Sequence, residues 1–124
     1  MSAPDYPVVT VMPGRHKRAE QGHPWVYSNE IQMDKAAKAL PPGSLVRLTA
    51  ASGKPLGLAT FNPHALVAAR IVDRDPAAVV DRAFIAGRLQ AAIALRQRFY
   101  SEPFYRAVHA EADGLPGLVI DRFG

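Results

Sequence analysis

Short apolar runs, many of them β-branched, alternate with turn signals through the first 76 residues of the chain. A Pro-Gly, Ser-Gly or Asn-Pro dipeptide stands close to each run, and the runs are residues 8–12, 44–49, 56–61 and 65–72. Several short strands at such close spacing are typical of small all-β folds, so the pattern predicts a small β-barrel. Residues 15–22 are expected to form one helical turn, and residues 25–31 an extended or mixed segment.

The pattern changes at Asp75 and Pro76, after which the chain favours a helix. Residues 77–102 contain no proline, and apolar side chains recur at helical spacing from about residue 82 to about residue 99. Asp81 stands where its carboxylate can cap the first turn. A single helix is therefore predicted here.

Two further strand candidates follow, and together they predict a β-hairpin over about residues 105–122. The chain thus divides into a mainly β part, residues 1–75, and a truncated α/β segment, residues 76–124, with one helix and one hairpin. Because one helix and two strands provide little core, the chain is expected to be cut short at Gly124.

Arg96 falls on the apolar face of the predicted helix. An unpaired guanidinium in an apolar environment is very costly, so this side chain is expected to meet a carboxylate. Glu111 and Asp113, on and after the first strand of the hairpin, are the expected partners.

Composition places the chain among folded soluble proteins, since 48% of its 124 residues are hydrophobic and 21% are charged. The absence of cysteine excludes disulfides, thiolate metal sites and a cysteine nucleophile within this stretch, and fits a reducing cytoplasm. No apolar run approaches the roughly 18 residues needed to cross a bilayer. A cytoplasmic protein without a membrane partner is expected.

The net charge of +4 is unevenly distributed. Residues 1–72 carry eight Lys and Arg against four Asp and Glu, whereas residues 73–124 carry seven of each. The whole excess thus lies in the first part of the chain. Such asymmetry is a hint of a polyanionic partner, because Lys and Arg that contact phosphates release counterions and provide affinity independent of sequence. An excess of four positive charges is also common on solvated surfaces, so the charge alone does not separate the two interpretations.

The densest group of positive residues follows the first Pro-Gly turn, and we call Arg15, His16, Lys17 and Arg18 the basic cluster. Arg15, Lys17 and Arg18 are the first candidates for phosphate contacts, and the supporting candidates are His16, His23, Lys54 and Arg70. The single tryptophan, Trp25, could stack on an unpaired base. A buried anchor is favoured for it, because a lone tryptophan in a small domain usually buries its surface.

A second group, His109, Glu111 and Asp113, alternates along the sequence and would share one face of a strand. It could hold a metal ion or supply an acid and a base, but an ion pair from Glu111 or Asp113 to Arg96 or Arg106 is the preferred interpretation. The sequence contains no glycine-rich nucleotide fingerprint, Walker loop or nucleophile elbow. No catalytic, cofactor-binding or metal residue is therefore assigned.

Two longer strings carry a resemblance to a known family. The first is the basic cluster leading to GHPWVYSNEI at residues 22–31, and the second is EADGLPGLVIDRFG at residues 111–124. Both resemble the amino-terminal region of bacterial large-subunit ribosomal RNA methyltransferases that modify carbon 5 of cytosine. Members of that family place a PUA RNA-binding domain first, then a small central α/β domain, then a domain that binds S-adenosylmethionine.

The resemblance implies that residues 1–75 form a PUA-like barrel and that residues 76–124 begin the central domain. The family's cofactor pocket and catalytic cysteine lie in the third domain, so the methyltransferase domain is absent from this stretch. S-adenosylmethionine is accordingly expected only in the presumed full-length protein.

The function favoured is the RNA-binding region of a ribosomal RNA methyltransferase, which positions RNA for methyl transfer elsewhere. One alternative is a structural or dimerisation module without RNA contact, which would include a homodimer of the full-length protein. Another is a metal-dependent hydrolase that uses His109, Glu111 and Asp113.

Overall fold

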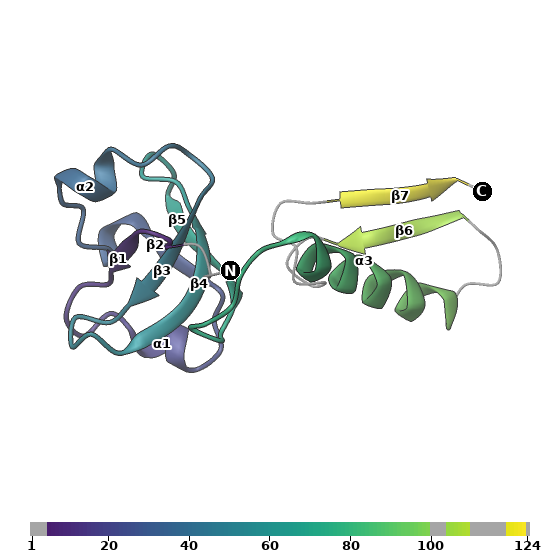
Figure 1. Ribbon diagram of the computed structural model, residues 1–124, viewed down its shortest axis with the longest axis horizontal. Coiled ribbons are helices and arrows are strands. Elements are labelled where there is room, and N and C mark those ends of the chain that lie inside the picture. Colours follow the sequence, from purple (N-terminus) through teal and green to yellow (C-terminus); the bar gives the residue numbers. More distant parts are fainter. Residues whose placement is uncertain (1–4, 100–103, 110–118, 124) are drawn as a thin grey trace. The chain divides into compact units, whose positions relative to one another are not determined.

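The computed structural model describes residues 5–99, 104–109 and 119–123 (Figure 1). The chain separates into two compact units, Met1–Val79 and Val80–Gly124. The division lies four residues beyond the change of pattern at residues 75 and 76. Each unit has its own strands and its own buried side chains.

The first unit is built on one five-stranded sheet with the order β1-β3-β4-β5-β2. Its strands are β1 Val8–Thr10, β2 Trp25–Tyr27, β3 Ser44–Thr49, β4 Pro55–Phe61 and β5 Val67–Asp73. β1 runs parallel to β3, and the other neighbours are antiparallel. The mainly β fold predicted from the alternating runs is confirmed.

The sheet curls so that the segments following its two edge strands meet. Val11, just after β1, forms an isolated antiparallel bridge with Ile31. Met12 N donates to the Glu30 carbonyl at 2.8 Å, and Gln32 N donates to the Thr10 carbonyl at 2.9 Å. These bonds satisfy backbone groups that an open edge would leave to solvent, and they bring the chain around Glu30 close to the end of β1.

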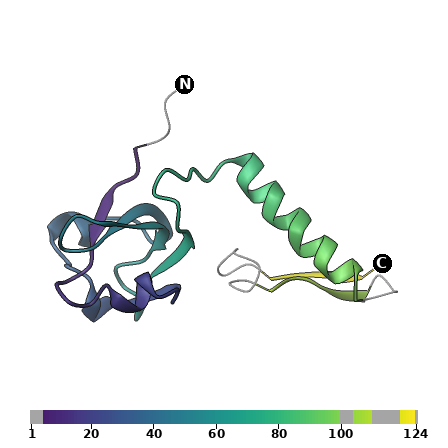
Figure 2. The ribbon, with the colours of Figure 1, turned by 90° about the horizontal axis from the view of Figure 1, so that it is seen from below.

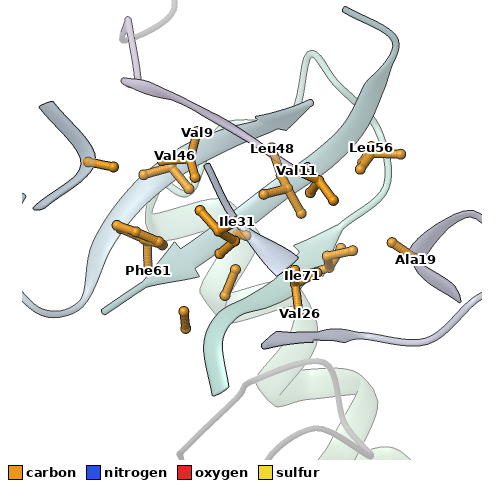
Figure 3. Close-up of a cluster of buried hydrophobic side chains, with 14 of the residues drawn as sticks. Val9, Val11, Ala19, Val26, Ile31, Val46, Leu48, Leu56, Phe61 and Ile71 are labelled. Atoms are coloured by element: carbon orange, nitrogen blue, oxygen red, sulfur yellow. The ribbon is translucent and has the colours of Figure 1, made fainter. Parts of the chain in front are cut away.

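The concave side of the sheet holds the core of the unit (Figure 3). Val46 and Leu48 alternate inward along β3, as expected for a strand with one buried face. β4 differs, because its residues from Leu56 to Ala59 are all buried. Phe61 is the largest fully buried side chain.

Three short helical segments complete the unit: α1 Lys17–Glu20, the 3-10 turn η1 Ser28–Glu30, and α2 Lys35–Lys38. α1 lies within the predicted helical turn, and the mixed segment resolves into β2 followed by η1. α2 was not expected from the sequence. Asp34 caps it, since the Asp34 carboxylate accepts a hydrogen bond from Ala37 N at 2.8 Å.

Gly57 in β4 is required by both its backbone conformation and its surroundings. Its φ is +140°, a conformation that L side chains rarely adopt. A Cβ atom at this position would collide with the carbonyl oxygen of Asp73 on β5 and lie 3.1 Å from the Cα of Arg74. The register between β4 and β5 shifts next to this point, between Leu58 and Ala59.

The second unit consists of α3 Arg82–Gln97 and the antiparallel strands β6 Phe104–His109 and β7 Val119–Phe123. Asp81 caps the helix as predicted, accepting from Phe84 N at 2.8 Å. α3 packs against β6 (Figure 2). The described core is small: Ala92 on the helix meets Ala107 and Val108 on the strand, with Leu89 partly buried beside them.

Arg96 is buried on the inner face of α3, and its guanidinium donates to the Ala92 carbonyl at 3.4 Å. Its expected carboxylate partners, Glu111 and Asp113, lie outside the described residues. Glu111 and Asp113 were also considered as partners of Arg106, and the ion pair of Arg106 that the structure describes is with a different acid. Arg106 pairs with Asp121, directly opposite on β7, at 2.7 Å, because the strand register places the two side chains together.

Several large apolar side chains of this unit are exposed, among them Ile85, Leu95 and Phe99 on and just after α3 and Ile120 on β7. Phe99 is the most exposed of them at 74%. Within the described ranges, no helix has both the length and the apolar character needed to cross a membrane.

Candidate nucleic-acid interface

The basic cluster is held in place at both ends by backbone hydrogen bonds. Gly14 takes a positive φ of 78° in the preceding turn, and Arg15 N donates to the Met12 carbonyl at 3.0 Å. At the other end, His23 N donates to the Arg18 carbonyl at 3.0 Å. A fixed backbone therefore presents these cations, the first two just before α1 and the last two on it.

The core of the unit and the side chain of Arg74 also hold α1 in place. Ala19 is buried in the core, while its neighbours on the helix face solvent. Arg74, just after β5, donates to the carbonyl of Ala19 and, at 3.4 Å, to the carbonyl of His23. Arg74 was not predicted to take part in the site, since its place between Asp73 and Asp75 gives no indication that it reaches α1.

Arg15 and Lys17 are exposed, and in the part of the chain that the structure describes neither side chain has a hydrogen bond or an ion pair. No acid among the described residues therefore balances their charges. Two such cations two residues apart on a fixed backbone can contact neighbouring phosphates. Of the three leading candidates, these two have no ion pair among the described residues, and their contact with phosphate stays a prediction.

Arg18 differs from the other two. Its guanidinium forms an ion pair with Glu30 at 2.6 Å and lies over the ring of Tyr27, 5.1 Å from the centroid. The Glu30 side chain is only 9% exposed, against 47% for Arg18. A buried carboxylate needs a partner, so Arg18 is an internally paired cation whose first role is to balance Glu30.

Lys54 is brought to the same region although 34 residues separate it from Glu20. It lies in the turn between β3 and β4, and its Nζ is 3.1 Å from the Glu20 carboxylate on α1. The Lys54 side chain is 65% exposed, so water screens this pair and the ammonium stays accessible to a ligand.

His23 and Arg70 meet around Trp25. The Arg70 guanidinium lies over the indole, 5.3 Å from its centroid, and the His23 ring meets it edge to face at 6.4 Å. Trp25 N donates to His23 Nδ1 at 3.2 Å. Trp25 is only partly buried, whereas its Nε1 and the Nδ1 of His16 are both buried without a hydrogen-bond partner in the described structure.

An open pocket of about 470 Å³ lies beside α1, and we call it the α1 pocket. It is lined by Arg15, Arg18, Tyr27, Asn29, Glu30 and Leu66. The bend from β2 into η1 turns Tyr27 and Glu30 toward the basic cluster, and Ser28 N holds the loop of Leu66 with a 2.8 Å bond to its carbonyl. The sequence did not single out these lining residues beyond the two arginines.

A smaller space of about 170 Å³ adjoins Arg70 on the other side of β5, between residues of β4 and β5. Thr60, Asn62 and Val67 contribute to its walls. Arg70 thus lies in contact with Trp25 and beside this second space, rather than in the α1 pocket.

Within the described ranges, no cluster of three or more His, Asp or Glu side chains could hold a metal ion. Glu111 and Asp113, two of the three residues first considered for a metal, lie outside those ranges, and His109 is known only as a residue of β6. The metal hypothesis therefore has no support from the described residues.

Comparison with known proteins places this arrangement in a family context. The chain is 36% identical over 118 residues to ribosomal RNA large subunit methyltransferase I of Shewanella denitrificans, covering 93% of the chain and 30% of that protein. It is also 36% identical over 114 residues to the protein of the same name from Cronobacter sakazakii, covering 90% of the chain and 28% of the relative. The chain thus spans about 30% of the length of these relatives.

Solved structures of low sequence identity share the fold. One, of a protein assigned as a methyltransferase and complexed with SAH, matches with a TM-score of 0.74 at 17% identity, over 95% of this chain and 30% of that one. Another, from Streptococcus mutans and assigned as SAM-dependent, matches with a TM-score of 0.72 at 16% identity, over 94% of this chain and 31% of that one.

The resemblance to large-subunit ribosomal RNA methyltransferases that the two sequence strings indicate is confirmed by these relatives. The family model of the PUA-like domain matches residues 9–74, which include every strand of the five-stranded sheet except the first residue of β1. The chain therefore belongs to the PUA-like domain family.

Proposed function

We propose that the PUA-like unit binds ribosomal RNA in the cytoplasm and positions it for methyl transfer from S-adenosylmethionine by another domain of a longer protein. Residues 1–75 are the RNA-binding domain in this proposal, and residues 76–124 begin a second α/β domain. The names of the relatives support the substrate, and the likeness to a protein complexed with SAH supports the cofactor.

The observation that carries the proposal is a pair of exposed cations, one just before α1 and one at its first residue. Arg15 and Lys17 have no internal partner among the described residues, while the first unit as a whole is basic. Lys54 adds an accessible ammonium beside the same helix. A phosphate backbone that crosses α1 would contact all three, which gives affinity with little dependence on sequence.

The salt dependence of binding to ribosomal RNA fragments tests the proposal. Each phosphate contact contributes roughly 0.7 to 0.9 to the slope of log affinity against log salt. The double variant Arg15→Ala, Lys17→Ala should therefore reduce the slope by about 1.4 to 1.8 and weaken binding most at low salt. Fluorescence anisotropy with labelled fragments measures both quantities.

A matched control removes the same charge elsewhere in the unit. Lys35 and Lys38 are exposed on α2, which Figure 1 shows at the other end of the unit from α1. The variant Lys35→Ala, Lys38→Ala should keep the slope of the unaltered protein. Equal losses in the two double variants would assign the affinity to net charge alone, and a flat salt dependence would remove phosphate contacts altogether.

A second candidate function, a module for protein packing or dimerisation, is favoured by the exposed side chains of the second unit. Leu95 and Phe99 are 44% and 74% exposed, and exposed apolar groups of this size mark interaction surfaces when they are contiguous. Light scattering separates the two candidates: salt-insensitive dimers without affinity for RNA would favour the module, and RNA-binding monomers the first proposal.

A further inference from the structure

The α1 pocket contains chemistry that phosphate contacts do not use. A phosphate seeks positive charge, yet a buried carboxylate and an apolar side chain line this pocket next to the two arginines. We propose that the α1 pocket receives one unpaired nucleobase that carries an exocyclic amino group. This inference rests on the proposed RNA binding and adds to it a preference among bases.

Glu30 supplies the preference. The residue is 6% exposed and lines the pocket, and in the described structure both hydrogen bonds of its carboxylate are made by Oε1. Oε1 accepts from Arg18 at 2.6 Å and from Tyr27 N at 3.0 Å. Oε2 keeps its capacity as an acceptor, and a carboxylate accepts hydrogen bonds only.

The amino groups of cytosine, adenine and guanine can donate to such an oxygen, as carboxylates do accept from cytosine N4 in nucleic-acid complexes. In the orientation that brings the amino group of cytosine to this carboxylate, uracil presents a carbonyl oxygen instead, and that oxygen would face the negative charge. Cytosine and uracil have the same size and shape, and the carboxylate therefore separates them by hydrogen bonding alone.

The other residues that line the α1 pocket suit a planar base attached to a charged RNA backbone. The planar Arg18 guanidinium, held between Glu30 and Tyr27, provides a surface on which a base can stack. Leu66 is 74% exposed at the rim and provides apolar contact. Arg15 lies at the same rim with its charge unpaired among the described residues, where the phosphate of the bound nucleotide can meet it.

The volume agrees with this occupant. Pockets for small ligands usually measure about 300 to 1,000 Å³, and the α1 pocket measures about 470 Å³. It is widely open to solvent. An unpaired nucleotide can therefore enter it while the strand on either side continues over α1.

The test uses the full chain and ten-residue oligouridylates whose central position is uridine, cytidine, adenosine or an abasic sugar. Anisotropy at fixed salt should give the cytidine and adenosine oligonucleotides at least about tenfold higher affinity than the uridine one, as expected for one hydrogen bond to a charged acceptor. The abasic oligonucleotide should bind no better than the uridine one.

The variant Glu30→Gln keeps the shape of the side chain and an acceptor for Arg18 while adding an amide donor. It should abolish or reverse the preference for cytidine over uridine, and urea unfolding followed by Trp25 fluorescence verifies that it folds. Leu66→Ala tests the pocket without touching Glu30. It should weaken binding of the cytidine oligonucleotide and leave abasic binding unchanged, whereas Val8→Ala, another exposed apolar residue at 64%, should change neither.

The outcomes distinguish the two proposals. Equal affinity for all four oligonucleotides, with the expected salt dependence, would overturn the base pocket and leave phosphate binding intact. A preference for cytidine that persists unchanged in Glu30→Gln would also overturn it. Failure of every oligonucleotide to bind at any salt concentration would overturn the base pocket together with the proposed function.

Discussion

The buried clusters of the two units, as far as the structure describes them, differ greatly in size. Among the described residues, fifteen buried side chains form one cluster in the first unit, and three form the cluster of the second. The first unit gathers them from all five strands and α1, so distant segments depend on one another. The second rests on one helix against one strand, and part of its apolar surface stays exposed.

Two ion pairs, one in each unit, also differ in how deeply they are buried. Arg18–Glu30 and Arg106–Asp121 have nearly equal lengths, 2.6 and 2.7 Å, and their arginines are 47% and 48% exposed. The acids differ, since Glu30 is 9% exposed and Asp121 is 37% exposed. Geometry alone therefore does not decide what a pair contributes. The contribution of a pair is decided by the free-energy cost of leaving its acid unpaired, and that cost increases as the acid becomes more buried.

The largest effect is expected from Leu48→Ala, because Leu48 is fully buried in the large cluster. A cavity of this kind costs about 3 kcal/mol of the free energy of unfolding. Trp25 is the single tryptophan and lies in the first unit, so urea unfolding followed by its fluorescence reports that unit alone.

Leu89→Ala is the counterpart in the second unit, where the side chain is only partly buried. In this variant the helical circular dichroism of α3 should be lost at a lower urea concentration. The fluorescence transition of Trp25 should stay at the same urea concentration as in the unaltered protein. If Leu89→Ala moved both transitions equally, the two units would unfold as one, and the contrast between their cores would lose its meaning.

A smaller effect, about 2 kcal/mol, is expected from Gly57→Ala, because the new Cβ would meet the Asp73 carbonyl and the backbone would be strained. Gly53→Ala is the control. Gly53 also has a positive φ, +91°, yet open space surrounds its would-be Cβ. A loss no greater for Gly57 than for Gly53 would show that backbone conformation, rather than the approach of β5, makes glycine necessary here.

The elements with strong local patterns were predictable from the sequence. β3 spans the predicted residues 44–49, and Asp81 caps α3 as expected. α2 was missed because four residues provide too little periodicity to recognise. The helix ends at Gln97, two residues before the expected Phe99. A small barrel was predicted, but the contact that closes the curled sheet was not, since Val11 and Ile31 meet across 20 residues of chain.

The candidate site was predictable in location and less so in detail. The cluster of cations on one turn marked α1, but sequence gave no means to know that Arg18 would face a buried acid twelve residues away. Burial of Glu30 follows from the bend between β2 and η1 and from the pairing of Val11 with Ile31. Such tertiary placement decides which cation is paired and which is accessible.

The smallest effect separates the two ion pairs. Arg18→Met leaves the buried Glu30 with only the Tyr27 backbone donor, so the first unit should lose about 1 to 2 kcal/mol. Arg106→Met leaves Asp121 in contact with water, and the unfolding of the second unit should not change measurably. Trp25 fluorescence and the circular dichroism of α3 measure the two effects.

The pH dependence of the stability of the second unit provides another test of the Arg106–Asp121 pair. The hydrogen bond to Asp121 and its negative charge raise the pKa of Arg106 above its ordinary value, which is already strongly alkaline. A raised pKa on a cation contributes stability below the pKa of the unfolded state, and that contribution is lost only as pH rises through the pKa of the folded state. From about pH 6 to pH 9, Arg106 therefore stays charged in both states, and Arg106→Met and the unaltered protein should show parallel stability curves for the second unit. Curves that diverge within this range would mean that another titrating group depends on Arg106, and the pair would then contribute more than its exposure suggests.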